Sequence, residues 1–522
     1  ILAIPCIEGT LRLLDIGPDV GLVVRTPAKI LEESSGQRYQ FNAKADLPYY
    51  GRTDLTGPEP RSFLVPKPSG VYRIVVFGGS TVIGFPYAPE LSFPRHIEIQ
   101  LKAQFPERQF EVLNAGMTAI NSFAVCDLVR QALFVEPDLV IVHTGHNEFY
   151  GPGGSASTSF NLSADLIRWT FRLRRWRLVQ WLTGNISSLP PPEDDLLDLL
   201  PGNLDIPLDG DVYQRARTNY EANLRQIVEL CDSANIPLLF TSVCCNLRDQ
   251  SPLASGWPLD SVNGKVEWLH RLKQAEQQLA NGRPEQALVE LDAADKIAPG
   301  SCVTAFRRGQ CEVAAGTTAG AWKQFRLARD LDGCRFRAPS EFADIVRSIS
   351  AESDNCHFWD TEQAIKESGY ELPPGFDLYF EHVHYNFEGH SLLGRIMAKA
   401  VCSEFLNSPW DESAAPNEDS LKQAIGFLPE DDLAAVSFCL EVLETGPFSQ
   451  SVDLEKHVQF LSQRAAEIYH ALPEIRRETF ADLTIADMVN GLAERLLEQH
   501  VRKGTNFAEE LRQAVRIRSG RR

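Results

Sequence analysis

A serine in the first part of the chain and a histidine in the last part have neighbours that suit nucleophilic catalysis. Ser80 follows a β-rich run and two glycines and precedes a helical stretch, so its hydroxyl would be exposed at a strand-to-helix turn. Glu381 precedes His384 by three residues. At that spacing a carboxylate can orient an imidazole and stabilise its charged form while the ring takes the serine proton. The ordinary alternative for Ser80 is a helix cap in a tight turn.

Two more polar loops could bind the negatively charged oxygen that such an attack creates. Asn114-Ala115-Gly116 ends the second predicted strand, and Gly145-His146-Asn147-Glu148 follows the third. The N–H groups of Ser80 and Gly116 and the side-chain amide of Asn147 would supply three donors, which is the requirement of an oxyanion hole.

These blocks, in this order, resemble the SGNH (GDSL-type) hydrolase superfamily. The four blocks are Gly78-Gly79-Ser80-Thr81, Asn114-Ala115-Gly116, Gly145-His146-Asn147-Glu148 and Glu381-His382-Val383-His384. The likeness spans about 71–250 and 340–408. The resemblance implies that Ser80 is the nucleophile, that His384 is the general base, and that Ser80, Gly116 and Asn147 hold the oxyanion. It also implies a serine-dependent esterase that forms an acyl-enzyme and uses neither a metal nor an organic cofactor.

Two positions depart from the pattern of that family. Glu381 stands where the family has Asp, and its extra methylene moves the carboxylate by about 1.5 Å. Glu148 also stands in place of an Asp, at a position that concerns support more than chemistry. The competing bases are the other histidines near these blocks, His143, His146 and His382. His384 is preferred because only it has the family spacing and is followed by Asn386 and Gly389.

Short apolar runs that alternate with helical stretches predict the framework that positions these groups. The expected strands are 71–77, 110–114, 137–143, 236–242 and 357–360, with helices near 96–105, 121–135 and 214–233. This alternation is typical of an α/β fold, a doubly wound parallel sheet of flavodoxin-like type with helices on both faces. Functional residues of such sheets gather in loops beyond the carboxyl ends of the strands, where the polar blocks fall.

We divide the chain into five segments. They are an N-terminal arm at 1–70, a first core part at 71–257, a helical insert at 258–338, a second core part at 339–409 and a C-terminal all-helical domain at 410–522. In the insert, Ala287, Leu291 and Ala294 recur 34 residues later as Ala321, Phe325 and Ala328, a period that resembles tetratricopeptide repeats. We interpret the insert as a rim of the active site, with a groove for a protein partner as the alternative.

Composition narrows the classes of partner. Acidic residues outnumber basic ones by 70 to 51, a formal charge of −19 at pH 7, which argues against nucleic acid. No stretch approaches the ~20 uninterrupted apolar residues of a membrane span. The apolar start at 1–14 lacks an initiator Met, so we interpret it as the tail of a signal or anchor segment. This predicts an extracytoplasmic, membrane-anchored protein; the alternative is a buried N-terminal strand or helix.

The stretch 166–182 combines three tryptophans with five arginines. Leu166, Trp169, Leu173 and Trp176 share one face of a helix. We interpret this as a docked helix with the tryptophan stripe in the core and the arginines in solvent. The alternative is contact with an anionic membrane surface or an acidic glycan.

The function that these observations favour is hydrolysis of a small-molecule or carbohydrate ester. Acyl groups on cell-envelope carbohydrate are the first substrates to test, by analogy with related folds. One alternative is an O-acyltransferase with the same Ser80 and His384. Another is a non-catalytic scaffold that retains the fold. Three arginines are candidates for binding an acidic substrate, with internal salt bridges as the alternative: Arg248, Arg335 and Arg337.

Overall fold

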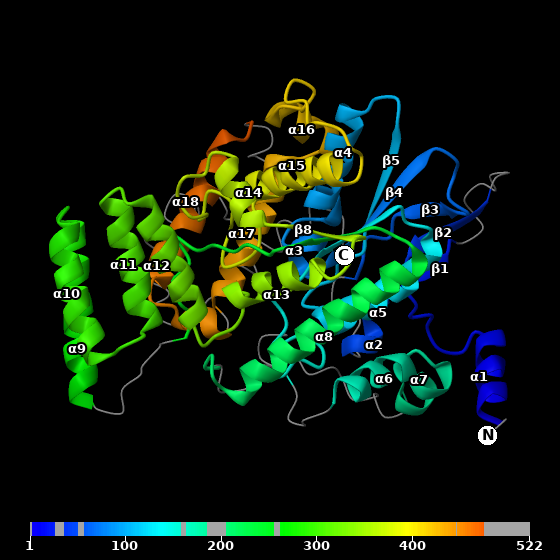
Figure 1. Cartoon of the computed structure of the whole chain (residues 1–522), viewed down its shortest axis with the longest axis horizontal. Coiled ribbons are helices and arrows are strands. Elements are labelled where there is room, and N and C mark those ends of the chain that lie inside the picture. Colours follow the sequence, from blue (N-terminus) through cyan, green and yellow to red (C-terminus); the bar gives the residue numbers. More distant parts are fainter. Residues whose placement is uncertain are drawn as a thin grey trace.

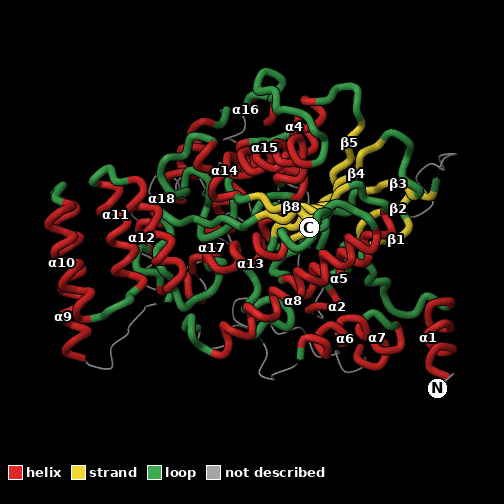
Figure 2. Tube along the Cα trace, viewed as in Figure 1, coloured by secondary structure: helices red, strands yellow, loops and turns green. Residues whose placement is uncertain are grey.

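A five-stranded parallel sheet forms the centre of the molecule (Figures 1 and 2). The computed structural model describes residues 3–26, 36–50, 57–157, 163–184, 205–254, 262–444 and 446–473. In spatial order the strands are β5 (Gln109–Asn114), β4 (Val71–Gly78), β6 (Leu139–His143), β7 (Leu238–Thr241) and β8 (Cys356–Trp359). The predicted α/β fold with a parallel sheet is confirmed.

Helices cover both faces of this sheet. In β4, Val75 and Phe77 belong to one core and Ile74 and Val76 to another, because successive side chains of a strand point to opposite faces. On the first face lie α5 (Ser122–Ala132) with the short helix η2 (Leu133–Val135), α8 (Asp211–Ala234) and α13 (Ser340–Ser350). On the second lie α4 (Phe93–Gln104), preceded by η1 (Pro89–Leu91), then α14 (Thr361–Glu367) and α15 (Phe387–Glu404).

The register brings the carboxyl ends of the first three strands to one edge. Val76 pairs with Asn114 of β5, and Gly78 pairs with His143 of β6. After β4 the chain forms β5 on one side of β4, and it then forms β6 on the opposite side of β4. The loops that follow β4 and β6 therefore lie at the switch point of the topology, where ligands of such sheets bind.

The N-terminal arm contains a helix at its start, where the sequence analysis considered a buried strand or helix as the alternative, and a small sheet that the sequence analysis did not predict. Its elements are α1 (Ala3–Leu13), β1 (Val23–Arg25), β2 (Gln37–Phe41), α2 (Leu47–Tyr50) and β3 (Ser62–Val65). The three strands form a separate antiparallel sheet in the order β1-β2-β3. They have three to five residues each, too few for a clear alternation of apolar and polar positions. Phe41 and Phe63 anchor this small sheet in the first core.

Four helices occupy the described part of the insert. They are α9 (Val262–Ala280), α10 (Pro284–Ile297), α11 (Cys302–Ala314) and α12 (Thr318–Leu331), and each packs on its neighbours along the chain. The periodic residues Ala287 and Ala321 are buried. Gly309 lets α12 approach, since a Cβ there would lie 2.7 Å from the Phe325 ring. That these helices are tetratricopeptide repeats remains a prediction.

Helices also fill the described part of the C-terminal segment. They are α16 (Glu418–Ile425), α17 (Pro429–Glu444), η3 (Gly446–Gln450) and α18 (Leu454–Ala471); residues 474–522 lie outside the described ranges. Leu433 and Leu461 share a core with Tyr87 and Phe380, which belong to the loops around the sheet edge. This segment therefore packs directly on the loops that carry the candidate site. Within the described ranges, no helix combines the length and apolar character needed to span a bilayer.

Candidate active site

Ser80 begins the four-residue helix α3 (Ser80–Ile83), which follows β4 with one intervening residue. Glycine is required before it. A Cβ at Gly78 would lie 2.1 Å from the carbonyl oxygen of His143, and one at Gly79 would lie 2.7 Å from Nδ2 of Asn147. As the first residue of the helix, Ser80 has a backbone N–H without a partner inside that helix. The local fold thus presents a hydroxyl and an N–H together at the switch point.

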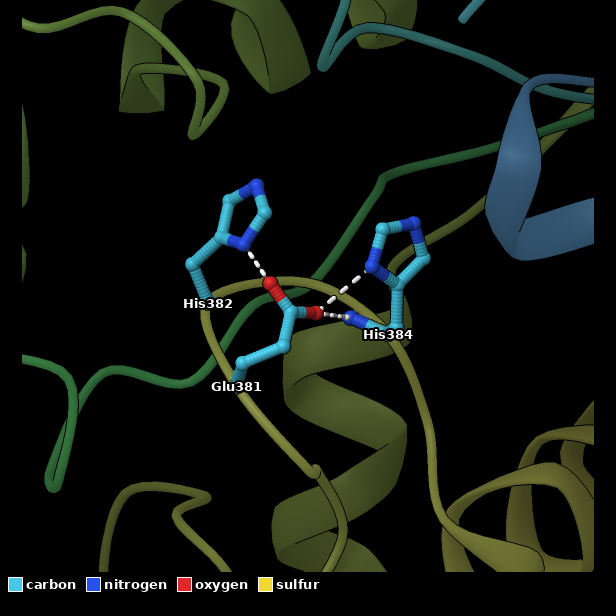
Figure 3. Close-up of side chains that lie close together, drawn as sticks. All are labelled: Glu381, His382 and His384. Atoms are coloured by element: carbon cyan, nitrogen blue, oxygen red, sulfur yellow. Dashed lines mark hydrogen bonds and ion pairs between the residues drawn. The ribbon is translucent and has the colours of Figure 1, made fainter. Parts of the chain in front are cut away.

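His384 and Glu381 extend from Ser80 as a chain of polar contacts. His384 Nε2 lies 2.7 Å from Ser80 Oγ, and His384 Nδ1 lies 2.6 Å from Glu381 Oε1. The other carboxylate oxygen of Glu381 contacts Nδ1 of His382, so that one carboxylate lies between two imidazoles (Figure 3). The sequence-predicted nucleophile, base and orienting acid are therefore brought together.

The loop around Glu381 accommodates the extra methylene of glutamate by folding back on it. Oε1 accepts a hydrogen bond from the backbone N–H of His384 at 2.6 Å and another from that of Val383 at 3.3 Å. These bonds pull the carboxylate toward its own backbone and place it beside the imidazole. A carboxylate one methylene longer than aspartate can thus occupy the orienting position.

The start of α15 holds this loop in place. The Asn386 side chain accepts a bond from the Gly389 N–H at 2.9 Å, which caps the helix. Its Nδ2 donates to the carbonyls of Phe376 and Asp377 at 3.1 and 3.2 Å. A Cβ at Gly389 would lie 2.2 Å from the carbonyl of Leu378. Asn386 and Gly389, which supported the choice of His384 in the sequence, thus hold the loop that carries His384.

The protonation state of His384 follows from its surroundings. Burial lowers the pKa of His384 to about 3, and the carboxylate of Glu381 opposes this because a nearby negative charge favours the charged ring. Since a carboxylate only accepts, Nδ1 carries the proton and Nε2 faces Ser80 as an acceptor. The neutral ring can therefore take the proton from the Ser80 hydroxyl.

The candidate oxyanion donors are arranged differently from the sequence prediction. Asn147 Nδ2 donates one proton to the carbonyl of Ile120 at 3.1 Å, and an amide nitrogen carries a second proton. The Gly116 N–H, however, donates to Oδ1 of Asn114 at 2.9 Å. The Gly116 N–H therefore has a partner within the protein, and its part in an oxyanion hole remains a prediction. The site as it stands offers the Ser80 N–H and the Asn147 amide.

The side chain of Asn114 is the partner that binds the backbone N–H of Gly116. Its buried side chain accepts from Gly116 and donates through Nδ2 to the carbonyl of Val82 at 2.9 Å and to Ser92 Oγ at 3.0 Å. The side chain thereby ties the end of β5 to α3. Whether the Gly116 N–H is free thus depends on the direction of the Asn114 side chain, which the spacing of the residues does not reveal.

The competing histidines at the end of β6 and in the loop after it bond to the framework. His143 Nδ1 lies 2.8 Å from Thr241 Oγ1. His146 Nε2 lies 3.2 Å from the carbonyl of Cys244, and its Nδ1 accepts from the Ala338 N–H at 3.2 Å. Burial lowers the pKa of both rings to about 3. These two histidines are neutral structural groups.

Glu148, the second departure from the family pattern, supports α5. Its Oε1 accepts from the N–H of Ser122 at 2.9 Å, and its Oε2 accepts from the Ser122 hydroxyl at 2.6 Å. Burial raises the pKa of Glu148 to about 7, while the hydrogen bonds from Ser122 act in the opposite direction. The side chain therefore joins the loop that carries Asn147 to the start of a helix.

The three arginines proposed for substrate binding are engaged within the protein. Arg248 forms ion pairs with Asp249 at 3.0 Å and Asp377 at 2.6 Å. Arg335 is buried and donates to the carbonyls of Ile206 and Asp330. Arg337 is buried and pairs with Asp332 at 3.1 Å. All three arginines therefore bond within the protein, as in the alternative considered from the sequence.

An aromatic pair beside the base was not found by sequence reasoning. The Phe85 ring lies 4.6 Å from the His384 ring, and Phe438 of α17 lies 4.7 Å from Phe85. Phe438 falls outside the apolar stripe of its helix formed by Leu433, Val436 and Leu440. A large aromatic residue off the core face was the available signal, but nothing in the sequence connected it to residue 85.

A metal could in principle use the same groups. Glu381, His382 and His384 form a described cluster whose ligand-type atoms lie within 4.8 Å of one another. His384, however, directs its two ring nitrogens to Ser80 and Glu381. With both nitrogens engaged in this way, the arrangement suits proton transfer from the serine better than coordination of an ion.

Comparisons with known proteins give distant structural likenesses. No family model matches the sequence, and no curated protein matches it significantly. A protein described as lipolytic, of the G-D-S-L family, from Desulfitobacterium hafniense DCB-2 is 12% identical with a TM-score of 0.26, over 62% of this chain and 97% of that one. The α/β hydrolase LAE5 from the metagenome of Lake Arreo is 11% identical with a TM-score of 0.28, over 62% of this chain and 93% of that one.

A third solved structure is similar over a shorter length. It is a two-domain esterase active on acetylated mannans, 18% identical with a TM-score of 0.13, over 31% of this chain and 50% of that one. At such identities and TM-scores these likenesses carry no argument about the activity of this chain. The functional argument depends on the site itself.

Proposed function

We propose that the chain is a serine-dependent ester hydrolase. The observation that carries the proposal is the continuous contact from Ser80 Oγ to His384 Nε2 at 2.7 Å and from His384 Nδ1 to Glu381 Oε1 at 2.6 Å. A nucleophile, a base and an orienting carboxylate in that order match the requirements of acyl transfer through a serine. The position of these groups at the switch point of the sheet supports the same function.

The reaction proceeds in two steps. Ser80 Oγ attacks the ester carbonyl while its proton passes to His384 Nε2, and the charged ring is stabilised by Glu381. The Ser80 N–H and the Asn147 amide stabilise the negative oxygen of the tetrahedral intermediate. His384 then protonates the leaving alkoxide, and an acyl group remains on Ser80. In the second step a water molecule gives a proton to His384 and attacks the acyl carbon, which releases the carboxylic acid and restores Ser80.

The resemblance described above makes acyl esters of carbohydrate, including those of the cell envelope, the first natural substrates to test. A protein partner bound by the helical insert and an extracytoplasmic location also remain predictions.

Turnover of a model acetate ester tests the proposal. We expect release of acetate from p-nitrophenyl acetate without added sugar, and loss of that activity in Ser80→Ala with folding intact. Turnover that requires an acceptor sugar would indicate an O-acyltransferase that uses the same residues. A correctly folded protein that releases no acetate under either condition would overturn the proposal and favour the scaffold alternative.

A further inference from the structure

The segment that carries the three tryptophans exposes the face that the sequence interpretation placed in the core. In α6 (Ala164–Arg174), Ile167 and Phe171 are buried in the first core. Trp169, on the outer side of the helix, is 56% exposed. Trp176 and Leu166 are exposed as well. The stripe expected in the core therefore faces outward.

Three arginines of the same segment bond to the body of the protein. Arg168 donates to Asn223 at 2.6 Å, and Arg175 forms an ion pair with Asp127. Arg174 donates to the carbonyls of Pro48 and Tyr49 at 3.2 Å. Because these cations attach α6 to the body of the protein, its apolar stripe is left on the surface.

Helix α1 extends this apolar surface through α7 (Arg177–Gly184), its neighbour in Figure 1. The two helices are joined by a carboxylate. The buried Glu8 accepts from the N–H groups of Arg177 and Leu178 at 3.1 and 2.9 Å. Polar contacts thus hold α1 in place, and its large apolar side chains, such as Leu13, remain exposed.

We call the exposed apolar residues of α1, α6 and α7, of the turn after α1 and of the turn between α6 and α7 the tryptophan surface. Its members are Ile7, Leu13, Leu14, Ile16, Leu166, Trp169, Trp176, Trp181 and Leu182. These nine are half of the eighteen large apolar residues that are exposed within the described ranges, and they include every exposed tryptophan among those eighteen. Single exposed apolar residues need no explanation, but a concentration of this kind marks an interaction site.

We propose that the tryptophan surface binds an anionic lipid bilayer. Tryptophan is the side chain enriched at the boundary between headgroups and acyl chains, where its apolar ring and polar N–H are both satisfied. Charge points to the same partner. Within residues 163–184 the exposed charged residues are Arg172, Arg174 and Asp165, a local excess of positive charge in a chain whose formal charge is −19. Exposed Arg172 lies three residues after Trp169 and four before Trp176, at the spacing of one helical face.

Vesicle flotation tests this proposal. The purified full chain is mixed with vesicles of phosphatidylcholine alone or with about 30 mol % phosphatidylglycerol. We expect binding to the anionic vesicles and weaker binding to the neutral ones. The double variant Leu166→Gln/Leu182→Gln removes two members of the tryptophan surface and should weaken vesicle binding by about tenfold.

A matched control separates this surface from general hydrophobicity. Leu269 and Leu327 of the helical insert are 43% and 41% exposed, compared with 42% for Leu166 and 52% for Leu182. The double variant Leu269→Gln/Leu327→Gln should bind vesicles like the wild type. Circular dichroism melts check that both variants are folded. Ser80→Ala should also bind normally, so failure of the ester hydrolysis proposal would leave this one standing.

Three outcomes would overturn the proposal. The first is a wild-type chain that does not float with either kind of vesicle. The second is equal binding by the Leu166→Gln/Leu182→Gln variant and its control. The third is a dimer in sedimentation analysis that the Leu166→Gln/Leu182→Gln variant dissociates, because a second copy of the chain would then be what covers the tryptophan surface.

Discussion

The loop after β6 and the loop before α15 lie at the same region of the sheet edge and contain similar residues, yet they have different tasks. His146, in the first loop, bonds through both ring nitrogens to backbone groups of the framework. His384, in the second, contacts a hydroxyl on one side and a carboxylate on the other. Burial lowers the pKa of both rings to about 3. The comparison teaches that the partners of a histidine, and not its burial, distinguish a base from a structural group.

Replacement of each histidine in turn gives the largest contrast. His384→Ala should lower kcat by about 10⁴-fold, because the serine loses its proton acceptor. His146→Gln removes framework bonds, so we expect it to lower the melting temperature while the folded enzyme keeps kcat within about tenfold of wild type. Kinetics on a model ester and melting curves of both variants check the contrast. Equal loss of kcat in the two would remove the distinction between the loops.

Substitution of Glu381 sharpens the account of how His384 is held. Glu381→Gln keeps the size of the side chain and removes its charge, so kcat should fall by about 10²- to 10⁴-fold. Glu381→Asp retracts the carboxylate by about 1.5 Å, so we expect a smaller loss. An unchanged rate in Glu381→Gln would exclude the carboxylate from catalysis.

The pH profile provides a second readout for the same pair. In the proposed mechanism neutral His384 is the base, and burial lowers its pKa, so the acid limb of kcat/KM should lie below the ordinary value of 6.5. The negative charge of Glu381 opposes that shift, so Glu381→Gln should move the limb to still lower pH. A limb at or above 6.5 in the wild type would contradict this electrostatic account.

Asn147 tests whether the first loop contributes to chemistry at all. Asn147→Ala removes one of the two candidate oxyanion donors, and kcat should fall by about 10²- to 10³-fold with little change in KM. Steady-state kinetics on the same model ester give both kcat and KM. A change confined to KM would show that Asn147 binds the substrate and does not stabilise the intermediate.

The last prediction concerns stability and arises at Glu148. Its pKa is raised to about 7 in the folded protein from 4.5, so the folded state holds an extra proton between these values and becomes less stable as the pH rises through them. Glu148→Gln cannot lose a proton. The stability of this variant relative to wild type should therefore rise by about 3 kcal/mol between pH 4.5 and pH 7. Urea unfolding at several pH values measures it, and a constant difference would contradict the raised pKa.

The central sheet and the candidate catalytic residues could be predicted because both depend on short local patterns, while the catalytic roles remain predictions. Buried parallel strands appear as apolar runs, and Ser80, Glu381 and His384 each have diagnostic neighbours. The β1-β2-β3 sheet was missed because strands of three to five residues are too short to show a period. Gly116 was assigned a free N–H because spacing does not show the direction of the Asn114 side chain.

The orientation of α6 could not be deduced for a similar reason. An amphipathic pattern shows that a helix has two faces, but which face is buried depends on what surrounds it. Here Asn223, the carbonyls near Tyr49 and Asp127 provide partners for Arg168, Arg174 and Arg175, which therefore attach the helix to the body of the protein, while Arg172 stays exposed. Those partners lie in segments far from α6 in the sequence.

Labelling with a fluorophosphonate tests the central claim most directly, because this reagent reacts with a serine only when the serine is activated. The account predicts one adduct per chain, located at Ser80 by peptide mass spectrometry, absent in Ser80→Ala and strongly slowed in His384→Ala. A folded protein that hydrolyses esters without labelling at Ser80, or that labels at a different residue, would contradict it.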